Sequence, residues 1–281
     1  MKLCWFNDRR LGLVQGDEIQ DITAIFNQLP SADPFSMSDY LIENLDFVKA
    51  SVANLQTNKA LIPIQSAKLL SPVLRPSKII GAPVNYHDHI SEAKNAATVF
   101  KQYDGGIEDQ GLFLKASSSL VGSSEGIEVL FPSRPTHHEI ELAVIIGKVG
   151  KNIPQDQALT YVAGYAIALD MTVRGNEDRS FRKSLDSYSV LGPFLTTADE
   201  VADPQNLAFT LDVNGELRQN SNTSDMIMKI DRQISWASTF YTLYPGDVIM
   251  TGTSAGVGPV VPGDVIVAKM QDLGSMTVVV R

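Results

Sequence analysis

The chain has 281 residues, 44% of them apolar, and its 32 Asp and Glu outnumber its 23 Lys and Arg to give a net charge of −9. An acidic chain with no Lys/Arg run lacks the basic stripe that displaces counterions from a polyanion, so no nucleic-acid partner is expected. No apolar stretch approaches the roughly 20 residues of a membrane span, the N-terminus lacks a signal-peptide core, and the single cysteine, Cys4, excludes a disulfide framework. We therefore expect a globular cytoplasmic protein that binds a small metabolite or cation.

The first 70 residues are predicted to form a small α/β domain. Apolar residues alternate around the turn pairs Asn7-Asp8 and Gly16-Asp17, which predicts short hairpin strands. A capping-box pattern at 36–39 precedes apolar residues at helical spacing, so one amphipathic helix should follow it. Prolines punctuate the next stretch, and we place a domain boundary near residue 70, with a catalytic domain over 71–281.

Residues 71–281 are predicted to form mostly strands. Leu207 to Val213 alternates apolar and polar residues and runs into Asn214-Gly215, a type I′ hairpin signal, and 265–267 and 277–280 predict further strands. The clearest helical run lies over about 227–241, with Ile230, Ile234 and Ala237 on one face. The expected fold class is α+β, predominantly β.

A pair of glutamates opens an apolar, β-branched run at His137-His138-Glu139-Ile140-Glu141. Residues two apart share one face of a strand, so Glu139 and Glu141 should project together, with Cβ atoms roughly 6–7 Å apart. Two like charges side by side need either a raised pKa or a cation between them. The alternative is that both carboxylates lie on the solvated face of an ordinary strand.

A third carboxylate, Asp170, ends the apolar run Tyr161–Leu169. A carboxylate at the end of a buried strand is a common site position, although a helix or turn cap is an alternative. Three carboxylates with little Cys or His around them form an oxygen-rich set, which suits Mg²⁺, Mn²⁺ or Ca²⁺ better than zinc. Adjacent residues of a strand point to opposite faces, so at most one of His137 and His138 can join the glutamates.

Several motifs in the same order resemble the fumarylacetoacetate hydrolase superfamily, in its single-chain acylpyruvase branch. They lie between Lys78 and the C-terminus and include Asn85-Tyr-His-Asp-His89, Phe113-Leu-Lys115, His-His-Glu-Ile-Glu-Leu, Gly164-Tyr-Ala-Ile-Ala-Leu-Asp170-Met-Thr, Lys183-Ser, Leu191-Gly-Pro193 and Thr251-Gly-Thr253. The resemblance implies a rolled mixed β-sheet with a small N-terminal domain, and usually a homodimer. It also implies that Glu139, Glu141 and Asp170 bind Mg²⁺ or Mn²⁺.

The resemblance implies roles for other side chains as well. Lys183 corresponds to an active-site lysine beside the metal, although the charge pattern of 177–183 alone favours a surface residue. His89 and Glu92 match a pair that sits on a mobile lid and activates water in acylpyruvate-cleaving members; on a helix they would be neighbours. The resemblance further implies three substrate-binding residues: Lys115, Arg174 and Thr253.

Two positions depart from the family pattern. Ser254 stands where members usually have Pro, which leaves the rigidity of the Thr253 loop open, and Gly175 follows Arg174 where many members have Asp. The glycine-rich loop at 251–258 also lacks the Gly-Lys-Ser/Thr ending of a phosphate-binding loop, which argues against a nucleotide ligand.

The resemblance implies a metal-dependent hydrolase that cleaves acylpyruvate-like 2-oxo acids, such as fumarylpyruvate, to pyruvate and a carboxylic acid. His89, oriented by Glu92, would take the proton from water attacking the distal carbonyl, while Lys183 would stabilise the developing enolate. Decarboxylation, hydration and isomerisation pass through the same kind of enolate. A 2-oxo acid decarboxylase, hydratase or isomerase is therefore the alternative, and a non-catalytic relative is another.

Overall fold

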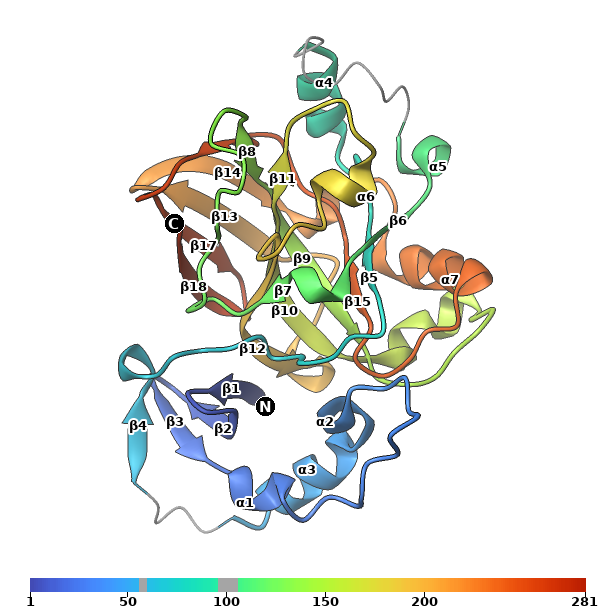
Figure 1. The fold of residues 1–281 in the computed structure, drawn as a ribbon. Coiled ribbons are helices and arrows are strands. Elements are labelled where there is room, and N and C mark those ends of the chain that lie inside the picture. The colour runs from blue at the N-terminus through green and yellow to red at the C-terminus, as the bar shows by residue number, and fades with distance from the viewer. Residues whose placement is uncertain (56–59, 96–105) are drawn as a thin grey trace.

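A long mixed β-sheet connects the N-terminal strands with the rest of the molecule (Figure 1). The computed structural model describes residues 1–55, 60–95 and 106–281, except for the side chains of 92–95. In these residues the sheet has eleven strands, ordered β4-β3-β2-β1-β12-β10-β9-β15-β5-β6, with β7 paired to β12. The strands are β1 (Lys2–Phe6), β2 (Arg10–Gln15), β3 (Glu18–Asp21), β4 (Leu61–Pro63), β5 (Ile79–Gly81), β6 (Phe113–Lys115), β7 (Leu120–Val121), β9 (Ile140–Ile146), β10 (Val162–Asp170), β12 (Ser189–Thr197) and β15 (Val248–Met250).

Two smaller sheets complete the β structure of the described residues. One has the order β11-β8-β16 and the other β14-β13-β17-β18. Their strands are β8 (Thr136–His138), β11 (Thr172–Val173), β13 (Ala208–Val213), β14 (Glu216–Asn222), β16 (Gly258–Val260), β17 (Val265–Met270) and β18 (Gly274–Val279). Asn214 and Gly215 have positive φ angles of 52° and 81°, so the predicted hairpin between β13 and β14 is confirmed.

The helices are short and lie around the sheets. They are α1 (Thr23–Phe26), α2 (Tyr40–Glu43), α3 (Leu45–Val52), α4 (His87–Asn95), α5 (Ile107–Gln110), α6 (Arg179–Arg182) and α7 (Ile230–Phe240), with 3₁₀ turns at Ile64–Ser66, Ser117–Ser119, Gln155–Tyr161, Ala198–Glu200 and Thr223–Asp225. Among the described residues, no helix is long and apolar enough to cross a membrane. The predicted α+β, predominantly β class is confirmed.

The N-terminal helix differs from its prediction. Asp39, rather than Ser36, is the N-cap: its side chain accepts hydrogen bonds from two backbone N–H groups of the first turn of α2, at 3.1 and 3.3 Å. The other oxygen of Asp39 accepts from the backbone N–H groups of 74 and 75, at 3.0 and 3.1 Å, so the start of α2 is held against the segment that precedes β5. The predicted single helix is also divided at Asn44 into α2 and α3.

The residues of β9 are buried on both faces, which explains why all of them except Glu141 are apolar. Leu142 and Val144 pack into the core that the main sheet shares with the four-stranded sheet and α7. Ala143 and Ile145 pack into a second core, against β1, β2 and the N-terminal helices. β1 also pairs directly with β12, so the N-terminal strands continue the main sheet. The division into domains at about residue 70 stays a prediction.

Helix α7 buries the face that its sequence period predicted. Ile230, Ile234 and Ala237 are fully buried in the larger core. Ile227 was expected in the helix but precedes it, because its backbone N–H is bonded to the carbonyl of Asn85 at 2.9 Å.

We expect Ile234→Ala to lower the free energy of unfolding by about 2–5 kcal/mol, because it removes buried methylene groups and leaves a cavity. Turnover of the folded variant should stay close to that of the parent. Denaturant unfolding followed by circular dichroism measures the first effect. Arg232→Ala, at an exposed position of the same helix, should change stability little. A large loss of turnover at unchanged stability would contradict a purely structural role for Ile234.

Candidate metal centre

Three buried carboxylates meet at one end of the long sheet. Glu139 lies between β8 and β9, Glu141 belongs to β9, and Asp170 ends β10. Each offers one ligand oxygen, and these oxygens all lie within 4.8 Å of one another. The glutamates therefore project together, as the strand period predicted, and the alternative of a solvated strand face is wrong because both are buried.

Lys183 reaches into this cluster from the end of α6. Its Nζ donates to Glu139 Oε2 and Asp170 Oδ2, both at 2.7 Å, and to Thr172 Oγ1 at 2.6 Å. The surface position that charge patterning favoured for Lys183 is therefore wrong. In Figure 1, α6 lies beside β11 and β6, at the same end of the molecule as α4 and β8.

Two further cations contact the carboxylates. Lys115, fully buried at the end of β6, forms an ion pair with Asp170 and donates to the backbone carbonyl of Tyr188 at 2.8 Å. Arg174 donates from Nη2 to Glu139 Oε1 at 3.2 Å and from Nε to His137 Nδ1 at 3.0 Å. Both were expected to bind substrate, and the structure places both at the carboxylate cluster.

Charge distribution in the cluster is uneven. Burial by itself raises the pKa of Glu139, but Lys183, Arg174 and His89 outweigh it and hold that pKa below its usual range. Burial and the two neighbouring carboxylates raise the pKa of Glu141 well above its usual value. Three carboxylates this close need more positive charge than the lysines supply if all are to be ionised.

A divalent cation fits this donor set. Three buried carboxylates with converging oxygens offer hard ligands, which Mg²⁺ and Mn²⁺ prefer. The ammonium group of Lys183 already bonds to two of the three carboxylates, so the cluster is shaped to hold positive charge. Glu139, Glu141 and Asp170 are the residues that would bind the ion.

The loop after β15 supports the cluster from the other side. The backbone N–H of Gly252 donates to Glu141 Oε2 at 2.6 Å. Gly252 has φ +97°, and a Cβ atom there would lie 2.7 Å from the Cβ of Asn85, so glycine is required. The hydroxyl of Thr253 donates to the carbonyl of Ile140 at 2.8 Å. Binding of a substrate carboxylate by Thr253 stays a prediction, and it requires that hydroxyl to leave Ile140.

His89 lies in α4 and is buried. It is close enough to Glu139 to help lower the pKa of that carboxyl. Glu92 belongs to the same helix, as the spacing predicted, but its side chain lies outside the described residues. The mobile lid that the resemblance implies for this pair, over about 86–97, also extends beyond the described residues and stays a prediction.

The two histidines that precede Glu139, His137 and His138, make different contacts. Burial and the nearby Arg174 lower the pKa of His137 to about 3, so the imidazole is neutral and accepts the guanidinium bond. His138 is fully buried and contacts the amide of Gln219, with Nδ1 and Oε1 3.0 Å apart. Sequence reasoning missed Gln219, and it missed Thr172, whose position two residues after Asp170 on an extended segment was the available signal.

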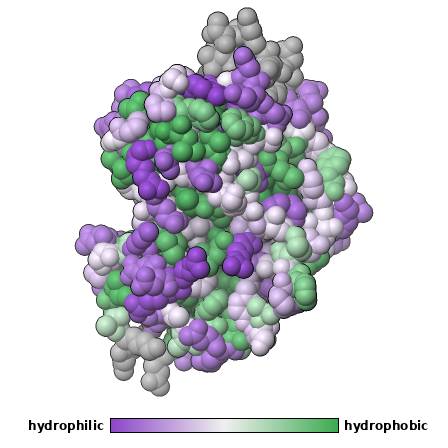
Figure 2. Space-filling view, viewed as in Figure 1, coloured by the Kyte–Doolittle hydropathy of each residue, from purple (hydrophilic) through white to green (hydrophobic). Residues whose placement is uncertain are grey.

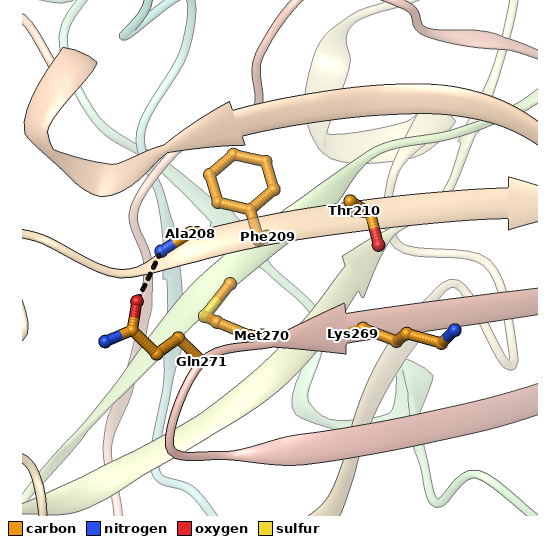
Figure 3. Close-up of a pocket in the computed structure, with 6 residues that line it drawn as sticks. All are labelled: Ala208, Phe209, Thr210, Lys269, Met270 and Gln271. Carbon is orange, nitrogen blue, oxygen red and sulfur yellow. Dashed lines mark hydrogen bonds between the residues drawn. The ribbon is translucent and has the colours of Figure 1, made fainter.

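A hollow of about 300 Å³ lies elsewhere, on the four-stranded sheet (Figure 3). Its lining residues come from β13, β17 and the residue after β17: Ala208, Phe209, Thr210, Lys269, Met270 and Gln271. Gln271 Oε1 accepts from the backbone N–H of Ala208 at 3.4 Å. These lining residues include no carboxylate and no imidazole, so the metal chemistry belongs to the other site.

The comparison with known protein families agrees with the geometry of the carboxylate site. The model of the fumarylacetoacetate (FAA) hydrolase C-terminal domain matches residues 78–281. The chain belongs to the fumarylacetoacetate hydrolase family. The resemblance found in the sequence motifs is thereby confirmed.

Individual relatives cover nearly the whole chain. The chain is 48% identical over 288 residues to maleylpyruvate hydrolase of Aquipseudomonas alcaligenes, covering 100% of this chain and 99% of the relative. It is 35% identical to the mitochondrial oxaloacetate tautomerase of Xenopus laevis, covering 95% of this chain and 84% of the relative. A crystal structure of maleylpyruvate hydrolase from Sphingobium sp. SYK-6, in complex with manganese(II) and pyruvate, is similar with a TM-score of 0.85 and 40% identity, covering 100% and 98% of the two chains.

Proposed function

We propose that this family member hydrolyses maleylpyruvate, or an acylpyruvate with a similar second carboxylate. In broader terms the protein is a metal-dependent hydrolase that cleaves a carbon–carbon bond of acylpyruvates, giving pyruvate and a carboxylic acid. The observation that carries the choice of substrate is the 48% identity, over the full length, to a maleylpyruvate hydrolase.

The charges around the site support a substrate with two carboxylates. Lys115, Lys183 and Arg174 form ion pairs with Asp170 and Glu139, beside Glu141, so three cationic side chains face three carboxyl groups. A bound divalent ion adds two positive charges, which a dianionic substrate would balance. Because uncompensated charge is costly in a buried site, a monoanionic substrate should bind less well.

The metal is Mn²⁺ or Mg²⁺, held by Glu139, Glu141 and Asp170. When bound, the ion supplies Lewis-acid polarisation of the 2-oxo acid and stabilises negative charge that develops on its oxygens. Manganese has the more direct support, from the similar maleylpyruvate hydrolase structure, and the use of Mg²⁺ stays a prediction.

We assign the remaining steps to side chains of this chain. Arg174, with its planar fork, takes the carboxylate of the 2-oxo acid, and Lys115 and Thr253 complete the binding site. His89 removes a proton from water as the water oxygen attacks the distal carbonyl carbon. The bond between that carbon and the neighbouring CH₂ then breaks. The electron pair forms the enolate of pyruvate, which Lys183 stabilises until the proton that His89 took from water is delivered to the CH₂ carbon.

A panel of substrates tests the proposed specificity. With Mn²⁺ present, kcat/KM for maleylpyruvate should exceed that for acetylpyruvate by about 10²-fold or more, because acetylpyruvate lacks the second carboxylate and leaves one positive charge of the metal-loaded site unbalanced. Enol absorbance follows substrate loss, and lactate dehydrogenase with NADH measures pyruvate.

Oxaloacetate provides the control in this panel, because relatives at 35% identity are oxaloacetate tautomerases. It also carries two carboxylates, but it lacks the acyl group that hydrolysis removes. Equal rates for acetylpyruvate and maleylpyruvate would contradict recognition of a second carboxylate. Tautomerisation of oxaloacetate that is faster than cleavage of every acylpyruvate would favour the isomerase alternative.

We also propose that the protein is a cytoplasmic homodimer that contacts its partner through the outer face of the four-stranded sheet. Leu217, Val261 and Val279, on and beside this sheet, are each more than half exposed. Figure 2 shows apolar surface toward the upper left of the molecule, where Figure 1 places β13 and β14. Large exposed apolar surface is typical of interfaces. Light scattering of the purified protein tests the dimer.

A further inference from the structure

Gln219 joins the two sides of the metal centre. It comes from β14 in the four-stranded sheet, outside the sheet that carries the carboxylates, and its side chain is completely buried. A buried primary amide can donate two hydrogen bonds and accept two, and it is costly to leave any of them unmade. The partners of this amide therefore define what it holds in place.

The carbonyl oxygen of the Gln219 amide binds both neighbours of the ligand Glu139. Oε1 accepts from the backbone N–H of Ile140 at 3.2 Å and lies 3.0 Å from His138 Nδ1. Because Oε1 can only accept, the proton of that second bond belongs to His138. One oxygen atom thus fixes the chain immediately before and immediately after Glu139.

The nitrogen of the same amide binds the loop that supports the ligand Glu141. Nε2 donates to Thr253 Oγ1 at 2.8 Å and to the carbonyl of Ser254 at 3.1 Å. These residues follow Gly252, whose N–H donates to Glu141 Oε2. The loop that holds Glu141 is therefore anchored to Gln219.

Thr253 closes a ring of hydrogen bonds. Its hydroxyl accepts from Gln219 and donates to the carbonyl of Ile140, while the N–H of Ile140 donates back to Gln219. Every hydrogen bond in this ring has a defined donor and a defined acceptor. The ring therefore fixes the loop at 251–254 relative to the start of β9.

A β-bulge turns Gln219 toward the site. Leu211 of β13 pairs with Gln219, whereas the next residue, Asp212, pairs with Leu217, so Arg218 is the extra residue of β14. Leu217 is consequently 53% exposed although it is two residues from the buried Gln219. Bulges near active sites commonly redirect a side chain in this way. The carbonyl of Arg218 also lies 2.0 Å from where a Cβ of Gly256 would be, which requires glycine in the adjoining loop.

We propose that Gln219 is a positioning residue that sets the separation of Glu139 and Glu141, and hence the affinity of the site for its divalent ion. It acts on both ligands through their neighbours and touches neither. The inference rests on the metal site of the proposed function. Its readout is metal binding, so failure of the hydrolase assignment would leave it standing.

The test compares Mn²⁺ binding by the full-length, metal-depleted protein and its variants, with free Mn²⁺ measured by electron paramagnetic resonance. Gln219→Met keeps the length of the side chain but removes all its hydrogen bonds. We expect the Mn²⁺ Kd to rise about 10–100-fold, the usual effect of removing a group that orients metal ligands. The matched control is Gln20→Met, which replaces another buried glutamine in β3, away from the site; its Kd should stay at the parent value.

The route through Thr253 is tested by a double-mutant cycle. Thr253→Val removes the hydroxyl that links Gln219 to Ile140, so Gln219→Met combined with Thr253→Val should weaken Mn²⁺ binding by less than the product of the two single effects. If Gln219→Met does not fold, Gln219→Asn replaces it, because an amide one methylene shorter cannot reach both Ile140 and Thr253. A folded variant at position 219 with the parent Kd would overturn the proposal, as would an equal rise in Kd for Gln20→Met.

Discussion

Asp170→Asn should abolish turnover and weaken Mn²⁺ binding by more than the roughly 10–100-fold loss seen when only a supporting group of a metal ligand is removed. The substitution exchanges an anionic oxygen ligand for a neutral amide, which a hard cation binds less well. It also leaves Lys115 and Lys183 without the carboxylate that both contact. Mn²⁺ titration and the rate of pyruvate release measure the two effects.

Asp247→Asn is the matched control for that experiment. Asp247 is also fully buried and paired with a lysine, Lys78, but it lies away from the three carboxylates. Its replacement should lower stability and leave the Mn²⁺ Kd unchanged. If Asp170→Asn bound Mn²⁺ as tightly as the parent protein, Asp170 would not be a ligand.

His89→Ala should slow acylpyruvate cleavage by roughly 10²–10⁴-fold, the usual contribution of a general base. Water attack on the distal carbonyl needs a group that takes its proton, and His89 is the buried imidazole of α4 near Glu139. Loss of CO₂ from oxaloacetate needs an electron sink rather than a base, so any decarboxylation should be much less affected. Steady-state rates with both substrates, at saturating Mn²⁺, provide the comparison.

His87→Ala is the control, because His87 lies in the same helix and is exposed. It should keep the parent rate. Glu92→Gln should have a milder effect than His89→Ala, since the imidazole remains but loses an orienting charge. Equal slowing of cleavage and decarboxylation by His89→Ala would argue against the general-base role and favour a decarboxylase or isomerase.

Local patterns in the sequence predicted those parts of the fold that depend on neighbours in the chain. The alternation before Asn214-Gly215 predicted the β13–β14 hairpin, and the helical period predicted the buried face of α7. The pairing of β1 with β12 joins residues almost two hundred positions apart. No local pattern encodes such a contact, so the extent of the main sheet could not be predicted.

Residues of the site were likewise predictable from the sequence only where the signal was local. Glu139 and Glu141 were predictable because a strand places residues two apart on one face, and Asp170 because it ends a buried run. Lys183 was misjudged from local charge, because its burial depends on carboxylates from two other strands. Gln219 was missed because its hydrogen-bond partners lie far away in the chain, and no local pattern marks the bulge at Arg218 that turns it toward them.

Pyruvate release from maleylpyruvate by chelator-treated enzyme tests the central claim most directly. After ethylenediaminetetraacetate treatment and gel filtration, the protein should stay folded but release no pyruvate, because the three carboxylates cannot activate the substrate alone. Stoichiometric Mn²⁺ should restore the full rate. Pyruvate release at the full rate from the metal-free protein, without added Mn²⁺, would contradict the account.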